Sequence, residues 1–355
     1  MNAHPAAAAL IFDRAPLRVY WELTRACDLA CQHCRAAAVK HRSPVELSTA
    51  EGLYLLERLR AFGEPKPHVA LTGGDPLKRP DLWLLIAAAK GLGLPVALAP
   101  SATGLLGPTE ILRFKQSGVE AISLSLDGST PARHDAFRGI AGTFAQTLVA
   151  AGAAREAGLP FQVNTLVAAE TLDDLPAIYL LANELGAARW SLFFLVAVGR
   201  GTVLEQITPS EGESVMRWLA ELMSQRGGPI VATTEAPHFR RVMLQRRHPA
   251  AREHGAGIRD GNGIMFISHC GDVQPSGFLP LSAGNVRTDD VVSMYRDSPL
   301  FRRLRQPDRF TGRCGRCEFH SHCGGSRARA YATSGDPFAE DPLCPYDPRR
   351  VLERA

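Results

Sequence analysis

The chain has 355 residues, of which 45% are hydrophobic and 21% are charged, with 32 glycines and 25 prolines. This composition predicts a globular protein of one large and one smaller domain, and it excludes a disordered or low-complexity chain. The 40 basic and 36 acidic side chains leave a net charge of only +4, which gives no indication of a nucleic-acid partner.

Residues 1–16 are expected to form an N-terminal extension. Their apolar stretch, residues 6–12, is short and no basic segment precedes it, so it predicts neither a secretion signal nor a membrane span. We therefore expect a cytoplasmic protein with no membrane partner. Because the cytosol keeps thiols reduced, the eight cysteines indicate metal binding or catalysis rather than disulfides.

Six short apolar runs, each followed by a turn and an amphipathic segment, indicate βα units and a parallel sheet. The predicted strands are residues 19–23, 68–72, 95–99, 121–126, 161–167 and 190–196. The predicted helices between them are residues 49–62, 80–92, 109–116, 143–157 and 172–185. Glycines stand at the left-handed capping position of these helices, namely Gly63, Gly93, Gly118, Gly158 and Gly186. Such units form either a doubly wound sheet or a partial barrel, and both gather chemistry at the carboxyl ends of the strands.

The chain after residue 200 departs from this repeat. Residues 201–262 are expected to be a helix, at 210–225, and a linker that ends in an irregular stretch at 240–263. Residues 263–355 contain a predicted hairpin at 264–276, a helix at 291–305 and a cysteine-rich tail. The tail is too poor in apolar residues to fold around a core alone, so a metal-stapled C-terminal domain is expected.

Three cysteines, Cys27, Cys31 and Cys34, follow the first predicted strand at the spacing C-x3-C-x2-C. One loop at the end of a strand can present all three thiolates to a single metal centre. A closed structural site uses four ligands, whereas three leave a position open for a reactant. A 4Fe-4S cluster with one free iron fits this pattern. The alternative is a zinc site that His33 or His41 completes.

The cysteine motif resembles that of the radical S-adenosylmethionine (SAM) superfamily. In this family the C-x3-C-x2-C loop follows the first strand of a partial (βα)6 barrel, and the open iron chelates the amino and carboxylate groups of SAM. The resemblance implies an α/β fold with a partial (βα)6 TIM-like barrel at residues 17–200, and a SAM-binding 4Fe-4S cluster on Cys27, Cys31 and Cys34. The residue before the third cysteine is often aromatic in the family. Here it is His33, which we expect to pack rather than to bind metal.

The second predicted strand ends in Thr72-Gly73-Gly74-Asp75-Pro76. Its glycines allow the backbone to approach a ligand closely, and its carboxylate can face a cation. In the radical SAM family a Gly-Gly-Glu-Pro segment at this place binds the amino group of SAM. The resemblance therefore implies that Gly73, Gly74, Asp75 and Pro76 contribute to SAM binding, with Asp75 standing where the family usually has glutamate.

The fourth predicted strand ends in a Ser-Leu-Asp-Gly segment at 125–128, and Arg138 follows it. Similar family members use the serine and an arginine on the SAM carboxylate, so the resemblance implies this role for Ser125 and Arg138. A guanidinium fork suits a planar carboxylate. Asn164 and Leu195, on the fifth and sixth strands, fall where relatives hold the ribose and adenine of SAM.

Four further cysteines, Cys314, Cys317, Cys323 and Cys344, are enough to close one complete metal site. By spacing alone a structural zinc fits them as well as an iron–sulfur cluster. The segment 317–332 resembles the C-terminal SPASM domain of radical SAM enzymes, and more narrowly the branch that assembles heme, heme d1 and pyrroloquinoline quinone. The resemblance implies an auxiliary 4Fe-4S cluster on these four cysteines.

Serine stands at two positions where many SPASM relatives have cysteine, Ser276 and Ser326. Because hydroxyls are poor ligands for iron–sulfur clusters, we expect a single auxiliary cluster. Cys270 is then left over as a turn or strand residue. Arg327 and Arg329 follow the third cysteine of this group. Either they act on the cluster or on a substrate carboxylate, or they face solvent.

The resemblance implies that the enzyme cleaves SAM reductively to methionine and a 5′-deoxyadenosyl radical, which abstracts hydrogen from a biosynthetic substrate. A flavodoxin or ferredoxin is implied as electron donor, since the chain has no G-x-G-x-x-G motif after a strand. The substrate is a tetrapyrrole, another small molecule or a ribosomal peptide, and the lack of a separate N-terminal peptide-binding domain favours the small molecule. Two alternatives remain: a zinc-stabilised α/β protein with structural cysteine sites, and a two-cluster electron-transfer protein.

Overall fold

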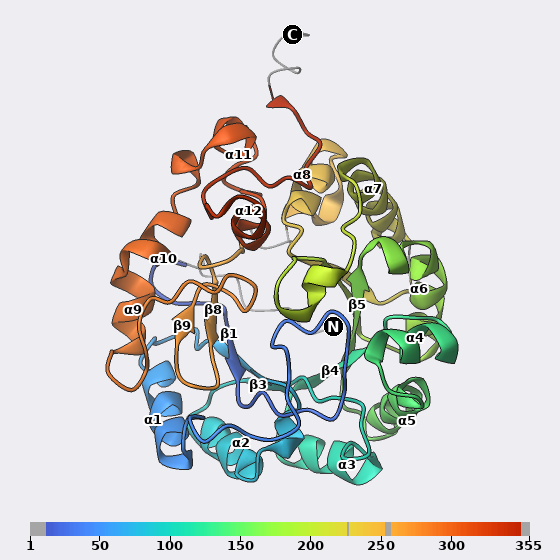
Figure 1. Ribbon diagram of the computed structural model, residues 1–355, viewed down its shortest axis with the longest axis vertical. Coiled ribbons are helices and arrows are strands. Elements are labelled where there is room, and N and C mark those ends of the chain that lie inside the picture. The colour runs from blue at the N-terminus through green and yellow to red at the C-terminus, as the bar shows by residue number, and fades with distance from the viewer. Residues whose placement is uncertain (1–11, 226, 253–256, 349–355) are drawn as a thin grey trace.

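A nine-stranded sheet lies at the centre of the computed structural model, which describes residues 12–225, 227–252 and 257–348. The strand order is β7-β6-β5-β4-β3-β2-β1-β8-β9, and all neighbouring strands are parallel except β8 and β9. The first six strands follow one another in chain order, as in a barrel, whereas a doubly wound sheet reverses direction. The predicted partial barrel is therefore confirmed. Figure 1 shows helices α1 to α7 arranged around the outside of the curved sheet.

The strands are β1 (Arg18–Glu22), β2 (His68–Thr72), β3 (Val96–Leu98), β4 (Ala121–Ser125), β5 (Phe161–Val167), β6 (Arg189–Phe194), β7 (Ile230–Thr234), β8 (Ile264–Ile267) and β9 (Val273–Gln274). The α-helices are α1 (Thr49–Arg60), α2 (Leu82–Gly91), α3 (Pro108–Gln116), α4 (Pro131–Arg138), α5 (Thr143–Glu156), α6 (Leu175–Glu184), α7 (Pro209–Ser224), α8 (His238–Gln245), α9 (Val291–Asp297), α10 (Pro299–Leu304), α11 (Gly312–Arg316) and α12 (Arg327–Ser334). Short 3-10 helices are η1 (Pro76–Lys78), η2 (Ala169–Asp174), η3 (Gly199–Val203), η4 (Pro249–Arg252) and η5 (Pro307–Arg309).

Local sequence signals explain where the helices begin and end. Helix α1 starts with a capping box, in which the Ser48 hydroxyl accepts from the Glu51 N–H and the Glu51 carboxylate accepts from the Ser48 N–H. Thr208 and Glu211 repeat this arrangement at α7. The five glycines predicted to follow helices have φ between +62° and +89°, so this prediction is confirmed.

The core forms where the apolar faces of the helices meet the sheet. Strand β1 buries Val19 and Trp21 completely, and Leu55 and Leu59 of α1 are buried beside it. At Gly52 of α1 an added methyl group would lie 2.9 Å from the Trp21 ring, so the helix packs directly on this side chain. Each such buried apolar side chain contributes about 1.5–3 kcal/mol.

The segment expected to be a helix and linker contains a further strand. Strand β7 pairs in parallel with β6, and helix α8 follows it in the stretch expected to be irregular. Its β-branched residues suit a strand, but the strand is short and only half-buried at the sheet edge, so the sequence signal was weak. Helix α4 was also missed, since Pro131 and the Gly139 cap bound only eight residues.

The predicted hairpin is confirmed, because β8 and β9 pair in antiparallel fashion. Its first strand also pairs in parallel with β1, so it adds to the barrel sheet at the edge opposite β7. The helix expected at 291–305 is two helices. Ser298 ends α9 and caps α10, accepting from the Phe301 N–H, and Pro299 takes the first position of α10.

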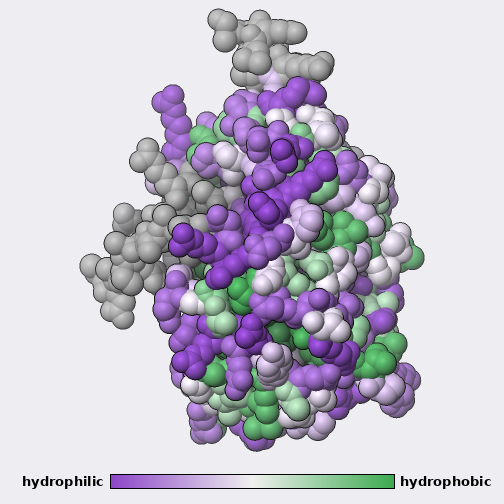
Figure 2. All heavy atoms as spheres, turned by 90° about the vertical axis from the view of Figure 1, so that its left-hand side faces the viewer, coloured by the Kyte–Doolittle hydropathy of each residue, from purple (hydrophilic) through white to green (hydrophobic). Residues whose placement is uncertain are grey.

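In the view of Figure 1 the C-terminal segment, with α11 and α12, lies at the top, between the side that carries α9 and α10 and the side that carries α7 and α8. Figure 2 shows the side of the molecule that carries α1, α9 and α10, where hydrophilic residues gather over the upper half. None of the helices in the described ranges is long and apolar enough to cross a membrane. Residues 1–11 of the expected N-terminal extension lie outside the described residues.

Candidate active site

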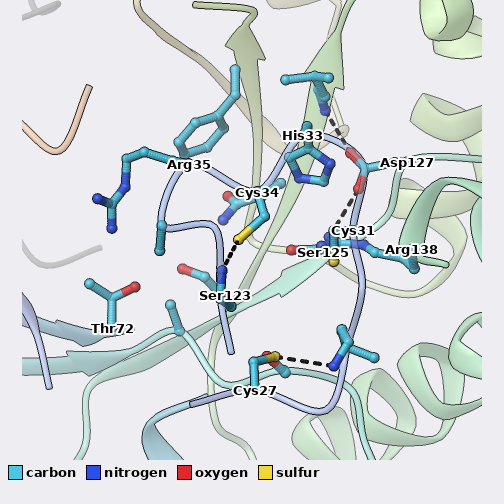
Figure 3. Close-up of a pocket in the computed structure, with 18 of the residues that line it drawn as sticks. Cys27, Cys31, His33, Cys34, Arg35, Thr72, Ser123, Ser125, Asp127 and Arg138 are labelled. Atoms are coloured by element: carbon cyan, nitrogen blue, oxygen red, sulfur yellow. Dashed lines mark hydrogen bonds and ion pairs between the residues drawn. The ribbon is translucent and has the colours of Figure 1, made fainter. Parts of the chain in front are cut away.

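Residues 23–39, here named the cysteine loop, leave β1 and line a pocket of about 240 Å³ at the carboxyl ends of the strands. The loop closes on itself, because the Cys27 N–H donates to Val39 O at 2.8 Å and the Val39 N–H donates to Arg25 O at 3.0 Å. Figure 3 shows Cys27, Cys31 and Cys34 along this loop, with Asp127 and Arg138 beside Cys31. One loop thus brings the three predicted ligands to one pocket.

The Gly-Gly segment after β2 fixes the start of the cysteine loop. The Gly74 N–H donates to Thr24 O and the Asp75 N–H donates to Ala26 O, both at 2.7 Å. A methyl group on Gly74 would lie 2.4 Å from Ala26 O, well inside van der Waals contact. The sequence suggested that these glycines admit a ligand. In the structure, the segment that approaches Gly74 is the cysteine loop of the same chain, and it leaves no room for a side chain.

Two further elements hold the far end of the cysteine loop. The C-terminus of α4 accepts from it, since the Ala30 N–H donates to Arg138 O at 3.2 Å. On the other side, the Arg200 N–H of η3 donates to Cys34 O at 3.0 Å. Gly199, at φ +55°, lies so close to Cys34 O that a methyl group there would be 2.6 Å away. The loop is therefore clamped between the ends of β2, β6 and α4.

Most of the residues expected to bind SAM lie around the same pocket. Those that line it are Gly73, Gly74, Ser125, Arg138, Asn164 and Leu195. Asp75 and Pro76 are not among the lining residues. The fully buried Asp75 carboxylate instead accepts from the Leu77 N–H at 3.1 Å and from the Thr103 hydroxyl at 3.2 Å. Burial raises the pKa of Asp75 to about 6.

A buried ion pair stands next to Cys31. The Arg138 guanidinium lies 2.9 Å from the Asp127 carboxylate and 3.3 Å from the Cys31 sulfur. Burial alone would raise the pKa of Asp127, but Arg138, with smaller contributions from His33, His134 and the Leu166 N–H, holds the pKa below the usual range. Burial likewise disfavours the Arg138 cation, yet Asp127 and the Cys31 sulfur raise its pKa above the ordinary value. Arg138 is thus a fixed cation beside the sulfur of Cys31.

His134 completes the support of this pair. Its Nδ1 accepts from the Asp127 N–H at 3.1 Å, so the ring proton lies on Nε2. Burial and the neighbouring Arg138 lower the pKa of His134 to about 4. The ring is therefore neutral at physiological pH, and the charged partner of the Asp127 carboxylate is Arg138.

His33 packs on the Phe137 ring with a centroid distance of 5.1 Å, as expected. Burial lowers the pKa of His33 to about 4. His41, the other residue that could have completed a zinc site, is exposed. Within the described ranges, no three His, Cys, Asp or Glu side chains converge closely enough to hold a single metal ion.

Ser101, Phe278 and Arg200 are among the lining residues that were not singled out from the sequence. The Ser101 hydroxyl donates to Gly74 O at 3.0 Å and lies 3.4 Å from the Cys27 sulfur. Phe278 and Arg200 reach the same pocket from the segments after β9 and β6. Ser101 and Arg200 both follow barrel strands, so the rule that chemistry gathers at strand ends could have found them.

The four C-terminal cysteines also come together. Cys314, Cys317, Cys323 and Cys344 line one small pocket, together with Arg241. Burial raises the pKa of all four thiols, that of Cys344 to about 11, while Arg241 partly offsets the effect at Cys344. Free thiols here would be protonated at neutral pH, so binding a cationic metal or cluster would release protons.

The two arginines after Cys323 are fully buried, so the alternative that they face solvent is wrong. Arg327 places Nη2 3.6 Å from the Cys314 sulfur and donates to Pro337 O and Ala339 O. Arg329 instead forms a buried ion pair with Asp341 at 3.1 Å. Of these two arginines, Arg327 is therefore the one that contacts a cysteine of this group.

The two serines at family cysteine positions have structural partners. The Ser326 hydroxyl caps α12 by accepting from the Arg329 N–H, and Ser276 accepts from the Phe278 N–H. Cys270 lies in the turn between β8 and β9 and donates to Asp272, and it lines neither cysteine pocket. The prediction of a turn residue is confirmed.

Comparison with known proteins identifies the family. Residues 21–182 match the Radical SAM superfamily. An AdoMet-dependent heme synthase from Nitratidesulfovibrio vulgaris is 41% identical to this chain, over 99% of both chains. The chain belongs to the radical SAM superfamily. This radical SAM enzyme is also 30% identical to a PqqA peptide cyclase from Ruegeria pomeroyi, over 94% of this chain and 88% of that one. The resemblance to the heme and pyrroloquinoline quinone branch is confirmed, and the two alternatives without SAM chemistry are wrong.

A solved structure has the same fold. Streptococcus suis SuiB bound to S-adenosylmethionine superposes with a TM-score of 0.74 over 94% of this chain and 78% of the other, at 17% identity. The family implies a 4Fe-4S cluster and SAM. The donors in the pocket fit this cluster, because three soft thiols on one loop leave one iron open and the Arg138 cation lies beside the sulfur of Cys31. When bound, the cluster supplies the electron that cleaves SAM.

Proposed function

We propose that the enzyme binds SAM to a 4Fe-4S cluster on Cys27, Cys31 and Cys34, and that the 5′-deoxyadenosyl radical formed from SAM abstracts hydrogen from a tetrapyrrole during heme assembly. The observation that carries this proposal is that the three cysteines and six of the residues expected to bind SAM line one pocket. The heme synthase with 41% identity over the whole chain supports the substrate class.

The lining of the pocket suits a tetrapyrrole with acidic side chains. Phe193, Leu195 and Phe278 offer apolar and aromatic surface, while Arg200 offers a cation. A peptide is the competing substrate, because a peptide cyclase is among the relatives, but its identity to this chain is 30% rather than 41%. The tetrapyrrole is therefore the better-supported substrate.

The atoms and electrons of the proposed reaction balance. The tetrapyrrole that we propose as substrate is Fe-coproporphyrin III, which carries propionates where heme carries vinyl groups. Conversion of a propionate to a vinyl group gives up a hydrogen atom to the radical, loses carbon dioxide and releases one electron. We propose the site formed by Cys314, Cys317, Cys323 and Cys344 as an auxiliary 4Fe-4S centre and as the candidate acceptor of this electron. A flavodoxin or ferredoxin is the proposed external donor.

Anaerobic reconstitution with iron and sulfide tests both sites. We expect about eight irons per chain, formation of 5′-deoxyadenosine from SAM under dithionite, and heme from Fe-coproporphyrin III. The Cys34→Ser variant should hold about four irons and make no 5′-deoxyadenosine. The Cys344→Ser variant should also hold about four irons, yet still cleave SAM. The matched Cys270→Ser control should keep all eight.

A different experimental result would refute each part of the proposal. Zinc with about four irons per chain would refute the auxiliary cluster. Iron without 5′-deoxyadenosine would refute SAM cleavage. Active SAM cleavage together with an unchanged porphyrin, or with a modified peptide instead, would refute the tetrapyrrole substrate.

A further inference from the structure

Arg200 reaches the cysteine loop from the opposite side of the barrel. It lies in η3, after β6, and three of its nitrogens bind the loop. The backbone N–H donates to Cys34 O at 3.0 Å, Nε donates to Cys31 O at 2.9 Å and Nη1 donates to Ala38 O at 3.1 Å. Arg200 therefore holds its guanidinium in a fixed position against the residues that carry the predicted cluster ligands.

The remaining terminal nitrogen of Arg200 has no partner within the described ranges. Its Nη2 is buried and has no hydrogen bond, and none of the described carboxylates forms an ion pair with the side chain. All the groups that Arg200 binds are neutral carbonyls. A guanidinium stays protonated in proteins, and a buried donor atom ordinarily has a hydrogen-bond partner. The described residues supply no such partner for Nη2 of the half-buried Arg200.

The other two arginines of the pocket are already paired. Arg35 contacts the Glu22 carboxylate at 2.5 Å and stacks on the Phe266 ring. Arg138 uses both terminal nitrogens, on Cys31 and Asp127. Of the arginines that line the pocket, Arg200 is therefore the one that offers an unused buried donor.

We propose that Arg200 binds the carboxylate of a ligand in the pocket through Nη2. Given the proposed function, this carboxylate belongs either to the methionine part of SAM or to an acidic side chain of the substrate. Both sources offer the same planar anion to a fixed guanidinium nitrogen. Arg200 then has two roles. Its Nε and Nη1 hold the cysteine loop, and its Nη2 binds the carboxylate of the ligand.

Removal of a carboxylate from the ligand separates the two sources. The variants are Arg200→Gln and Arg200→Lys, and the matched control is Arg217→Gln on the exposed face of α7. Iron per chain and the electron paramagnetic resonance spectrum of the reduced protein first establish that each variant holds its clusters. Equilibrium dialysis then compares SAM with decarboxylated SAM. Absorbance titration compares Fe-coproporphyrin III with its methyl ester.

A charged hydrogen bond is worth about 1.5–3 kcal/mol, so we expect Arg200→Gln to weaken binding of one acid about 10- to 100-fold. Arg200→Lys, which keeps the charge, should lose less. Binding of the matching compound without a carboxylate should not change. The ligand whose affinity falls in the variant, SAM or the porphyrin, is the one whose carboxylate binds Arg200.

Equal weakening for a ligand with and without its carboxylate would overturn the proposal, as would affinities within about twofold of wild type in variants that hold all their iron. Loss of iron in both variants would also overturn it, since Arg200 would then serve the loop alone. If the wild type fails to bind the porphyrin but binds SAM, the proposed substrate fails, while the SAM comparison still tests Arg200.

Discussion

Replacement of Gly74 by alanine should remove the iron of the proposed barrel cluster and leave the proposed C-terminal cluster in place. The added methyl group would lie 2.4 Å from Ala26 O and 2.7 Å from Arg25 O. Ordinary contact begins near 3.4 Å, so the two segments must move apart by about 1 Å. Both contacts are backbone atoms, which cannot rotate away as the end of a flexible side chain could.

The cost follows from the hydrogen bonds that this shift breaks. The bonds from the Gly74 N–H to Thr24 O and from the Asp75 N–H to Ala26 O are 2.7 Å long, and a shift of 1 Å would stretch both beyond useful range. Each buried group left without a partner costs about 1–3 kcal/mol. Cys27 follows Ala26 directly, and metal sites tolerate ligand displacements of only about 0.2 Å. The cysteine loop should therefore release its cluster before the whole protein unfolds.

The assay is iron per chain after anaerobic reconstitution, together with 5′-deoxyadenosine formation. Gly74→Ala should fall from about eight to about four irons and should lose SAM cleavage. The matched control is Gly152→Ala within α5, where an added methyl group has no neighbour within 4 Å. Because alanine favours a helix by about 1 kcal/mol over glycine, the control should be at least as stable as wild type. Full iron and normal SAM cleavage in Gly74→Ala would refute the role given to this glycine.

Two further predictions concern stability. Because burial raises the pKa of Asp75 to about 6 in the folded state, above its ordinary 3.8, the free energy of unfolding should fall by about 2 kcal/mol as the pH rises from 4 to 7. The Asp75→Asn variant should lack this part of the dependence when urea unfolding is measured across that range, and parallel curves for the two proteins would contradict the assignment. Replacement of Arg329 by methionine leaves the Asp341 carboxylate buried without its cation and should lower the free energy of unfolding by about 3–5 kcal/mol. The exposed Arg309→Met is its control, and equal unfolding curves for these two variants would refute the estimate.

The parts of the site that lie close together in the chain were predictable from the sequence. The spacing of Cys27, Cys31 and Cys34 places three thiols on one loop, and the strand pattern places that loop at the carboxyl end of β1. The side chain of Asp75 was not predictable in the same way. A carboxylate after two glycines can face a ligand or fold back on its own chain, and the choice depended on Thr103, which the tertiary fold brings to it.

The order of the βα units, the glycine caps and the grouping of seven cysteines into two sets could be predicted without a structure, because each of these signals lies within a few consecutive residues. Three features depend on the folded chain: β7 and β8 extend the sheet at its two edges, Arg138 pairs with Asp127, and Arg200 meets the cysteine loop from a segment more than 160 residues away. These features depend on the fold because a buried charge takes whichever partner the packing of distant elements presents to it. The identity of that partner is therefore a property of the folded chain and not of its local sequence.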